Sequence, residues 1–186
     1  MAERGAKSKF QPKPVTEDWL RRSAFHYLER YAASGEGLRR VLRRRAARRV
    51  GGVDALPNDL DTMIDGLLER FAELKLIDDR AFAEARLASL RRKGTSRSMA
   101  AARLGEKGVG RALVQAVLDE DETTEAAAAA TYAKRRRFGP HRRSGRDDRR
   151  DKEIASMLRA GFPMRLAIAA IDGEISSNDM DLSEGD

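Results

Sequence analysis

Apolar residues recur along most of this chain at the spacing of an amphipathic helix. The longest run begins at Leu60 and predicts one helix with a single buried face. Its apolar positions are Leu60, Met63, Ile64, Leu67, Leu68, Phe71 and Leu74. Shorter stripes with the same spacing predict eight further helices, and we therefore expect an all-α fold.

Polar residues mark where the predicted helices begin. Serine, threonine, asparagine and aspartate are favoured as N-caps because their side chains accept hydrogen bonds from the free N–H groups of the first turn. The expected caps are Thr16, Asn58, Asp78, Ser96 and Thr123 or Thr124. The segment 34–37 is expected to end the first helix, and Pro163 is expected in the first turn of the last.

The stretch 76–94 joins two of these helices. Asp78 is expected to cap the second one, and Asp79 adds negative charge to its first turn, where it opposes the helix dipole. Two adjacent aspartates could also form a metal-binding or catalytic pair. Capping accounts for both of them, and we expect a structural role.

Helix stops and apolar stripes repeat along the chain. Gly108 followed by Val109 matches Gly161 followed by Phe162, 53 residues later, and the apolar stripes that follow these stops match at the same spacing. A looser copy lies in the first part of the chain. This repetition favours tandem three-helix units in an elongated, curved array. The alternative is a single bundle of helices that merely look alike. The expected units are 16–77, 78–122 and 123–173, between a disordered basic tail (1–15) and a disordered acidic tail (174–186).

Composition narrows the class of protein. The 186 residues include 36% charged and only 5% aromatic side chains, with a net charge of +7 and no cysteine. The lack of cysteine excludes disulfides, zinc–thiolate sites and cysteine nucleophiles. The first 15 residues lack the apolar segment of a signal peptide, and no apolar run reaches the roughly 18–20 residues of a membrane span. We therefore expect a cytoplasmic protein.

Little in the sequence points to catalysis. His26 and His141 are the only histidines, and they are too far apart for a paired ligand motif. The sequence Gly108-Val109-Gly110 follows a predicted helix instead of a strand, and no Walker-type phosphate loop is present. We expect no enzymatic activity, no cofactor and no metal.

Cationic side chains are the chemistry that remains. A solvated surface would explain any one of them, and a GC-rich genome would also favour arginine. However, arginine greatly outnumbers lysine here, and its planar guanidinium suits paired contacts with phosphate or carboxylate. The residues expected to contact a partner are Arg39, Arg40, Arg43, Arg44, Arg86, Arg91, Arg92, Lys93, Arg97, Arg103, Lys107 and Arg111. These residues form two groups, one in each of the first two expected units. A third basic group, in the third unit, comprises Lys134, Arg135, Arg136, Arg137, Arg142, Arg143, Arg146, Arg149 and Arg150.

Three segments together resemble the RecX family of recombinase regulators. They are Leu76-Ile77-Asp78-Asp79 with Phe82-Ala83, the basic run Arg91 to Gly94, and Lys107-Gly108-Val109. Arg159-Ala160-Gly161-Phe162 resembles the end motif of the family's third unit, and the resemblance extends over about 16–173. The segments 50–57 and 138–150 depart from the family by lengthening the first and third units.

The resemblance implies three tandem three-helix repeats and a protein partner. Family members bind RecA and fit into the groove of the RecA filament on single-stranded DNA. They restrain its ATPase, strand-exchange and co-protease activities and are not enzymes. We therefore expect a monomeric RecA regulator in DNA repair and recombination, with possible direct DNA contact. The alternative is an independent helical nucleic-acid-binding protein that acts without RecA.

Overall fold

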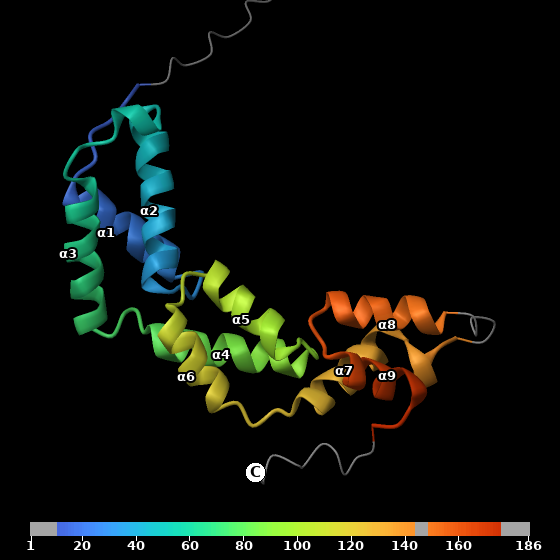
Figure 1. Cartoon of the computed structure of the whole chain (residues 1–186). Helices are drawn as coiled ribbons and strands as arrows, with labels where there is room; N and C mark the ends of the chain where they lie inside the picture. Colours follow the sequence, from blue (N-terminus) through green and yellow to red (C-terminus); the bar gives the residue numbers. More distant parts are fainter. Residues whose placement is uncertain (1–10, 144–148, 176–186) are drawn as a thin grey trace, which may run out of the picture. The chain divides into compact units, whose positions relative to one another are not determined.

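The computed structural model describes residues 11–143 and 149–175, and all of its regular structure is helical (Figure 1). The all-α prediction is therefore confirmed. The chain forms two compact units, Met1–Asp79 and Arg80–Asp186. The helices are α1 (Glu17–Leu28), α2 (Gly35–Val50), α3 (Leu60–Glu73), α4 (Asp79–Arg92), α5 (Arg97–Glu106), α6 (Arg111–Asp119), α7 (Glu125–Arg136), α8 (Arg150–Arg159) and α9 (Met164–Asp172), with short 3-10 helices at Val53–Ala55 and Gly139–His141.

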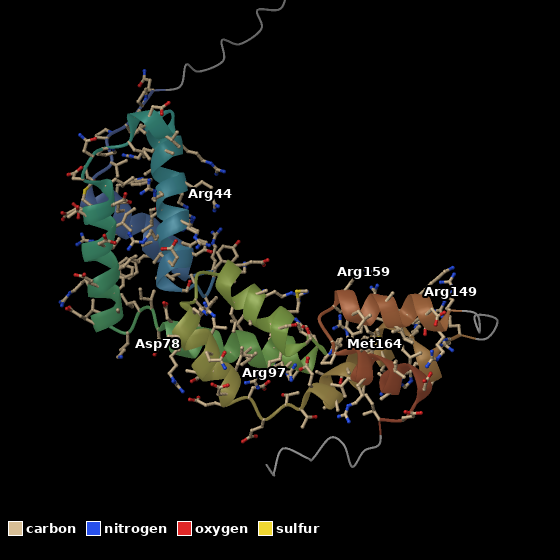
Figure 2. All side chains as sticks on the ribbon, in the orientation of Figure 1. Arg44, Asp78, Arg97, Arg149, Arg159 and Met164 are labelled. Atoms are coloured by element: carbon tan, nitrogen blue, oxygen red, sulfur yellow. The ribbon has the colours of Figure 1, made fainter. Side chains whose placement is uncertain are left out.

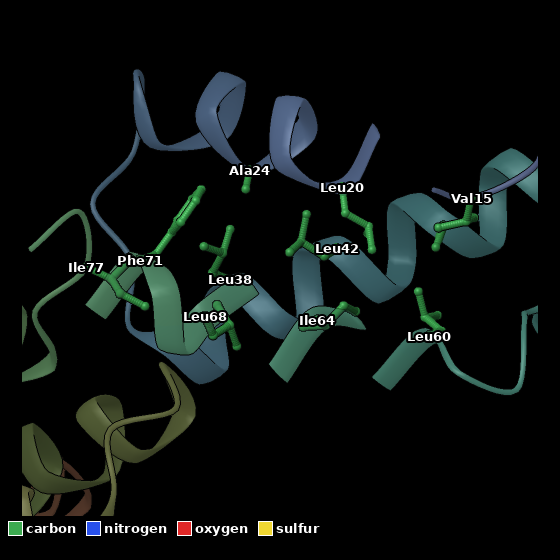
Figure 3. Packing of buried hydrophobic residues seen from close by; sticks show 11 residues of the cluster. Val15, Leu20, Ala24, Leu38, Leu42, Leu60, Ile64, Leu68, Phe71 and Ile77 are labelled. Atoms are coloured by element: carbon green, nitrogen blue, oxygen red, sulfur yellow. The ribbon is translucent and has the colours of Figure 1, made fainter. Parts of the chain in front are cut away.

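The first unit packs α1, α2 and α3 around one apolar core (Figure 3). The long stripe predicted from Leu60 onward supplies α3's share of this core, including the buried Ile64 and Phe71. Thr16 caps α1 as predicted, because its hydroxyl accepts a hydrogen bond from the Trp19 N–H at 3.3 Å. Trp19 itself is half-buried beneath the guanidinium of Arg49, 4.8 Å from the ring centre.

Two predicted helix boundaries in this unit are wrong. Ser34 begins α2 instead of ending α1, since its hydroxyl accepts a hydrogen bond from the Gly37 N–H at 3.0 Å. Asn58 does not cap α3, which starts at Leu60 after a turn that places Asp59 at the N-cap position without a side-chain hydrogen bond. Both errors concern glycine-, asparagine- or aspartate-rich turns, where the same residue types serve helix ends and helix starts.

The two aspartates between α3 and α4 have separate positions. Asp78 directly precedes the first residue of α4 (Figure 2), which is the position in which the cap was predicted. The carboxylate of Asp79 reaches back 44 residues in sequence and accepts a hydrogen bond from the Gly35 N–H, the first of α2, at 2.7 Å. Asp79 therefore stabilises the start of α2, a role that its place in the sequence did not indicate.

The predicted tails lie mostly outside the described residues. Residues 13–15, however, pack against α2 in contrast to the disorder expected for them. The Lys13 N–H donates to the Arg49 carbonyl at 3.1 Å, Arg49 donates to the Pro14 carbonyl at 2.7 Å, and Val15 is buried in the core.

The second unit contains two helix sets, each with its own core. One core lies among α4, α5 and α6, and the other among α7, α8 and α9. Ser96 caps α5 and Thr124 caps α7, as predicted, with hydrogen bonds to the Met99 and Ala127 N–H groups at 3.3 and 3.1 Å. Pro163 occupies the N-cap position of α9, one residue earlier than predicted.

The middle helix of each set ends in the same way. The N–H beyond the glycine bonds back to the carbonyl five residues earlier, at 3.1 Å for Val109 to Leu104 and 3.2 Å for Phe162 to Met157. Gly108 and Gly161 both have φ near 87°, which glycine adopts without strain. The matched stops support the predicted tandem three-helix repeats. The residue limits proposed for the three units remain a prediction.

An ion pair joins the first residue of α8 to the last of α9. Arg150 donates two hydrogen bonds to Asp172, at 2.7 and 2.6 Å. These bonds lower the pKa of the Asp172 carboxyl despite opposing desolvation, and they raise the pKa of Arg150.

This pair predicts a pH dependence confined to acid solution. A carboxyl whose pKa is lower in the folded protein stabilises the fold above its unfolded pKa, and this contribution is lost as the pH falls through the folded pKa. We expect Asp172→Asn to reduce thermal stability slightly near pH 7 and to converge with the wild type at strongly acidic pH. Thermal unfolding across the acid range tests this, and a difference that grows on acidification would contradict it.

Candidate polyanion-binding groove

Arg91 joins the two helix sets of the second unit from a buried position. Its side chain is 1% exposed and forms ion pairs with Asp121 at 2.6 Å and Glu125 at 2.8 Å. Two further N–H groups donate to the carbonyls of Thr95 at 2.8 Å and Thr123 at 2.6 Å. The prediction that Arg91 contacts a partner is therefore wrong, because its guanidinium is buried and is bound by groups inside the protein.

Glu125 extends this junction to a third helix. Besides pairing with Arg91, its two carboxylate oxygens lie 3.1 Å from the Arg97 N–H at the start of α5. One carboxylate in the first turn of α7 thus contacts the last turn of α4 and the first turn of α5. The three helix ends are held together by charge-assisted hydrogen bonds.

Two glycines allow close approach between the helix sets. A Cβ on Gly94 would lie 2.5 Å from the backbone nitrogen of Tyr132, so the turn after α4 rests directly on α7. A Cβ on Gly161 would collide with the hydroxyls of Ser96 and Ser98. These hydroxyls donate to the carbonyls of Ala160 at 2.6 Å and Gly161 at 3.1 Å, which joins the start of α5 to the turn after α8.

A groove of about 520 Å³ opens above this packed junction. We call it the basic groove. Its lining comes from the turn between α4 and α5, from α5, from α7 and from the end of α8. The residues are Lys93, Gly94, Thr95, Ser96, Met99, Arg103, Tyr132, Arg135, Arg136, Ser156, Arg159 and Ala160. Five of them are cationic, and none is acidic.

The cations of the basic groove are free to bind an anion. Within the described residues, none of the five makes an ion pair with a carboxylate. Arg135 instead donates to the Lys93 carbonyl, which directs its guanidinium across the groove, and Arg136 lies over the Phe138 ring, 5.7 Å from its centre. Uncompensated like charges in a concave surface raise the local concentration of anionic partners. Phosphates and carboxylates are the groups that this surface suits.

The predicted contact residues of the first unit are mostly neutralised. Arg39 pairs with Glu36 and Asp65, Arg40 pairs with Glu36, and Arg43 pairs with Asp61. Arg44 is the exception, since it is exposed and has no acidic partner among the described residues (Figure 2).

Apart from Arg91, the predicted contact residues of the second unit separate into three groups. Lys93 and Arg103 line the basic groove. Arg97 pairs with Asp119 at 2.8 Å and is partly neutralised. The remaining exposed cations, which lie outside the groove lining, are Arg86, Arg92, Lys107 and Arg111.

Sequence reasoning did not identify Arg159 or Tyr132 as groove residues. Arg135 and Arg136 belonged to the third basic group but were not placed with Lys93, and Arg146 of that group lies outside the described residues. The sequence could not place these residues together, because 42 positions separate Lys93 from Arg135. The described part of the chain contains no cluster of three potential metal ligands and no helix long and apolar enough to cross a membrane.

Comparisons with known proteins agree with the repeated helical architecture. Residues 78–118 match the family model described as RecX, second three-helix domain. The regulatory protein RecX of Myxococcus xanthus is 34% identical over 174 residues, which cover 91% of each chain. That of Agrobacterium fabrum is 30% identical over 84% of this chain and 83% of its own, and that of Thermobifida fusca is 28% identical over 66% of each. No solved structure gives a significant match. The near-complete coverage at this identity shows that the chain belongs to the RecX family of regulatory proteins.

Proposed function

We propose that this protein regulates the RecA recombinase by binding RecA and its filament on single-stranded DNA. It acts in the cytoplasm as a monomer and lowers the ATPase, strand-exchange and co-protease activities of the filament. The observation that carries this proposal is the alignment with the regulatory protein RecX of Myxococcus xanthus along 91% of both chains. The basic groove supplies the surface through which the effect is exerted.

The charge of the surface fits a filament as partner. A recombinase filament on single-stranded DNA carries the phosphates of that DNA and repeats one protein surface along its length. The basic groove and Arg44 offer uncompensated cations on two separate units of one chain. When one of two linked contacts has formed, it raises the effective concentration of the second contact near the filament. Individually weak contacts therefore combine into tight binding.

Co-sedimentation with RecA filaments on single-stranded DNA tests the proposal. We expect the protein to pellet with the filament and to remain in solution with RecA alone at the same ionic strength. Absence from the pellet at micromolar concentrations of both proteins would contradict the proposal.

The second candidate function is independent nucleic-acid binding without RecA. The basic groove also favours this function, because its cations do not depend on a protein partner. The two functions differ in two respects: an independent binder would associate with DNA equally well with or without RecA, and it would leave RecA turnover unchanged.

A further inference from the structure

A second basic hollow adjoins the basic groove on the third helix set. It has a volume of about 270 Å³ and lies between the end of α7 and the start of α8. Its lining residues are Arg136, Arg137, Phe138, Arg143, Arg149, Lys152 and Glu153. Arg136 also lines the basic groove, so the two depressions meet at this side chain.

The lining residues of α8 show that both depressions follow one helix face. Arg149 and Lys152 line the hollow, whereas Ser156 and Arg159 line the groove. These positions are separated by three, four and three residues, which is the spacing of a single face of an α-helix. Arg149 and Arg159 lie at opposite ends of α8 (Figure 2).

Charge along this face is almost entirely positive. Among the residues that the structure describes, Glu153 is the single acidic one in either lining, and it is buried. Its carboxylate accepts hydrogen bonds from the Gly139 N–H at 2.9 Å and from Arg142 at 2.8 Å. Glu153 therefore stabilises the turn beneath the surface and does not neutralise the exposed cations.

We propose that the basic groove and the adjoining hollow form one continuous track that binds the phosphate backbone of a single-stranded nucleic acid. The inference deepens the proposed function and rests on it for the biological setting. We call this surface the strand track. Its cations are Lys93, Arg103, Arg135, Arg136, Arg137, Arg143, Arg149, Lys152 and Arg159.

The length of the strand track suits several consecutive phosphates. Helix α8 has ten residues and is therefore about 15 Å long. Phosphates of a stacked strand follow each other at about 3.4 Å along its axis, and those of an extended strand lie farther apart, so the track spans at most about four of them. An isolated phosphate would need only one cluster of cations, and a row of clusters favours a chain of phosphates.

Apolar side chains between the cations favour a single strand over a duplex. Tyr132 and Met99 line the groove, and Phe138 lines the hollow. Exposed bases of a single strand can pack on such surfaces irrespective of sequence, whereas the bases of a duplex are stacked on each other. Acidic protein segments carry carboxylates but lack flat bases to occupy these positions.

Fluorescence anisotropy with a labelled thirty-residue oligothymidylate, in the absence of RecA, tests the inference. The track variant carries Arg103→Gln, Lys152→Gln and Arg159→Gln. The control variant carries Arg22→Gln, Arg86→Gln and Arg111→Gln, which remove the same charge from exposed positions outside the track. Circular dichroism establishes that both variants retain the helical content of the wild type.

We expect the track variant to bind oligothymidylate at least about tenfold more weakly at low salt, whereas the control variant stays within about twofold of the wild type. The slope of log affinity against log salt should fall by about 2 in the track variant, because each phosphate contact of a single strand contributes about 0.7. Equal losses in both variants would overturn the inference, since they would indicate diffuse attraction. Tighter binding of a hairpin duplex, or stronger competition by polyglutamate than by unlabelled oligothymidylate, would also overturn it.

The strand track and the proposed function can fail separately. A wild-type protein that binds oligothymidylate but does not affect RecA would contradict the proposed function and leave the track intact. A track variant that no longer binds oligothymidylate but still lowers RecA turnover like the wild type would show that strand binding is not needed for regulation.

Discussion

Replacing Arg91 with alanine is expected to destabilise the second unit by about 3–5 kcal/mol. The substitution leaves the carboxylates of Asp121 and Glu125 without their buried partner, and removing one member of a buried ion pair costs about this much. It also removes the donors to the Thr95 and Thr123 carbonyls. The effect should therefore exceed that of removing any exposed arginine.

The single tryptophan allows this effect to be assigned to one unit. Trp19 belongs to the first unit, and its fluorescence reports unfolding there, whereas circular dichroism reports helices of the whole chain. In Arg91→Ala, the urea transition followed by circular dichroism should split, with part of it at lower urea, while the Trp19 transition stays in place. The exposed neighbour Arg92→Ala serves as the control, with a change within about 0.5 kcal/mol.

A triple variant separates the cost of the unpaired carboxylates from the cost of the lost arginine contacts. Arg91→Met combined with Asp121→Asn and Glu125→Gln removes the stranded charges along with the arginine. We expect it to be more stable than Arg91→Met alone, because neutral groups are cheaper to bury than unpaired carboxylates. Identical stability of Arg91→Ala and Arg92→Ala would show that Arg91 does not hold the helix sets together.

Replacing Gly94 with alanine is expected to cost about 2–4 kcal/mol in the same unit. Gly94 has a φ of 68°, which disfavours any residue with a Cβ, and the added atom would lie 2.5 Å from the Tyr132 nitrogen. This clash is relieved only if the turn after α4 moves away from α7. Since Gly94 and Tyr132 both line the basic groove, strand binding should weaken together with stability.

Gly105→Ala is the matched control for Gly94→Ala. Gly105 lies within α5, and a Cβ there meets nothing within 4 Å. Alanine at a helix interior is favoured over glycine by about 0.5–1 kcal/mol, so this variant should be slightly more stable than the wild type. Urea unfolding followed by circular dichroism measures both variants, and a neutral Gly94→Ala would contradict the close packing of α4 on α7.

Local patterns were sufficient to predict much of the fold. The stripe from Leu60 and the caps at Thr16 and Ser96 act within one helix or one turn, where neighbours in sequence are also neighbours in space. The matched stops at Gly108 and Gly161 are equally local. The turn at 34–37 was placed wrongly because its residue types fit both ends of a helix, and the start of α3 was placed one residue early because Asn58 and Asp59 both suit an N-cap.

Contacts between helix sets were harder to predict. Arg91 looked like its neighbours in a basic run, yet its partners Asp121 and Glu125 lie 30 and 34 positions away. One signal was available: Arg91 follows Leu87 by four residues and therefore lies on the buried face of α4. Charge alone could not separate Arg39 or Arg43, which are neutralised by acids on α3, from Arg44, which is not.

The groove depends on the same long-range contacts. Lys93 comes from the turn after α4, Arg135 from α7 and Arg159 from α8, and only the packing around Arg91, Gly94 and Gly161 brings them to one surface. Arginine content indicated a polyanionic partner but could not show which arginines share a surface. The turn at the end of α4 lies against the side of α7. An approximate repeat period in the sequence does not specify this contact.

The central claim is that this RecX-family protein restrains RecA through its basic groove. The most direct test is RecA ATPase on single-stranded DNA, titrated with the wild type, the track variant and the control variant. We expect the wild type and the control variant to lower turnover at the same concentration, and the track variant to need a several-fold higher concentration. RecA turnover that stays unchanged at saturating wild-type protein would contradict the claim.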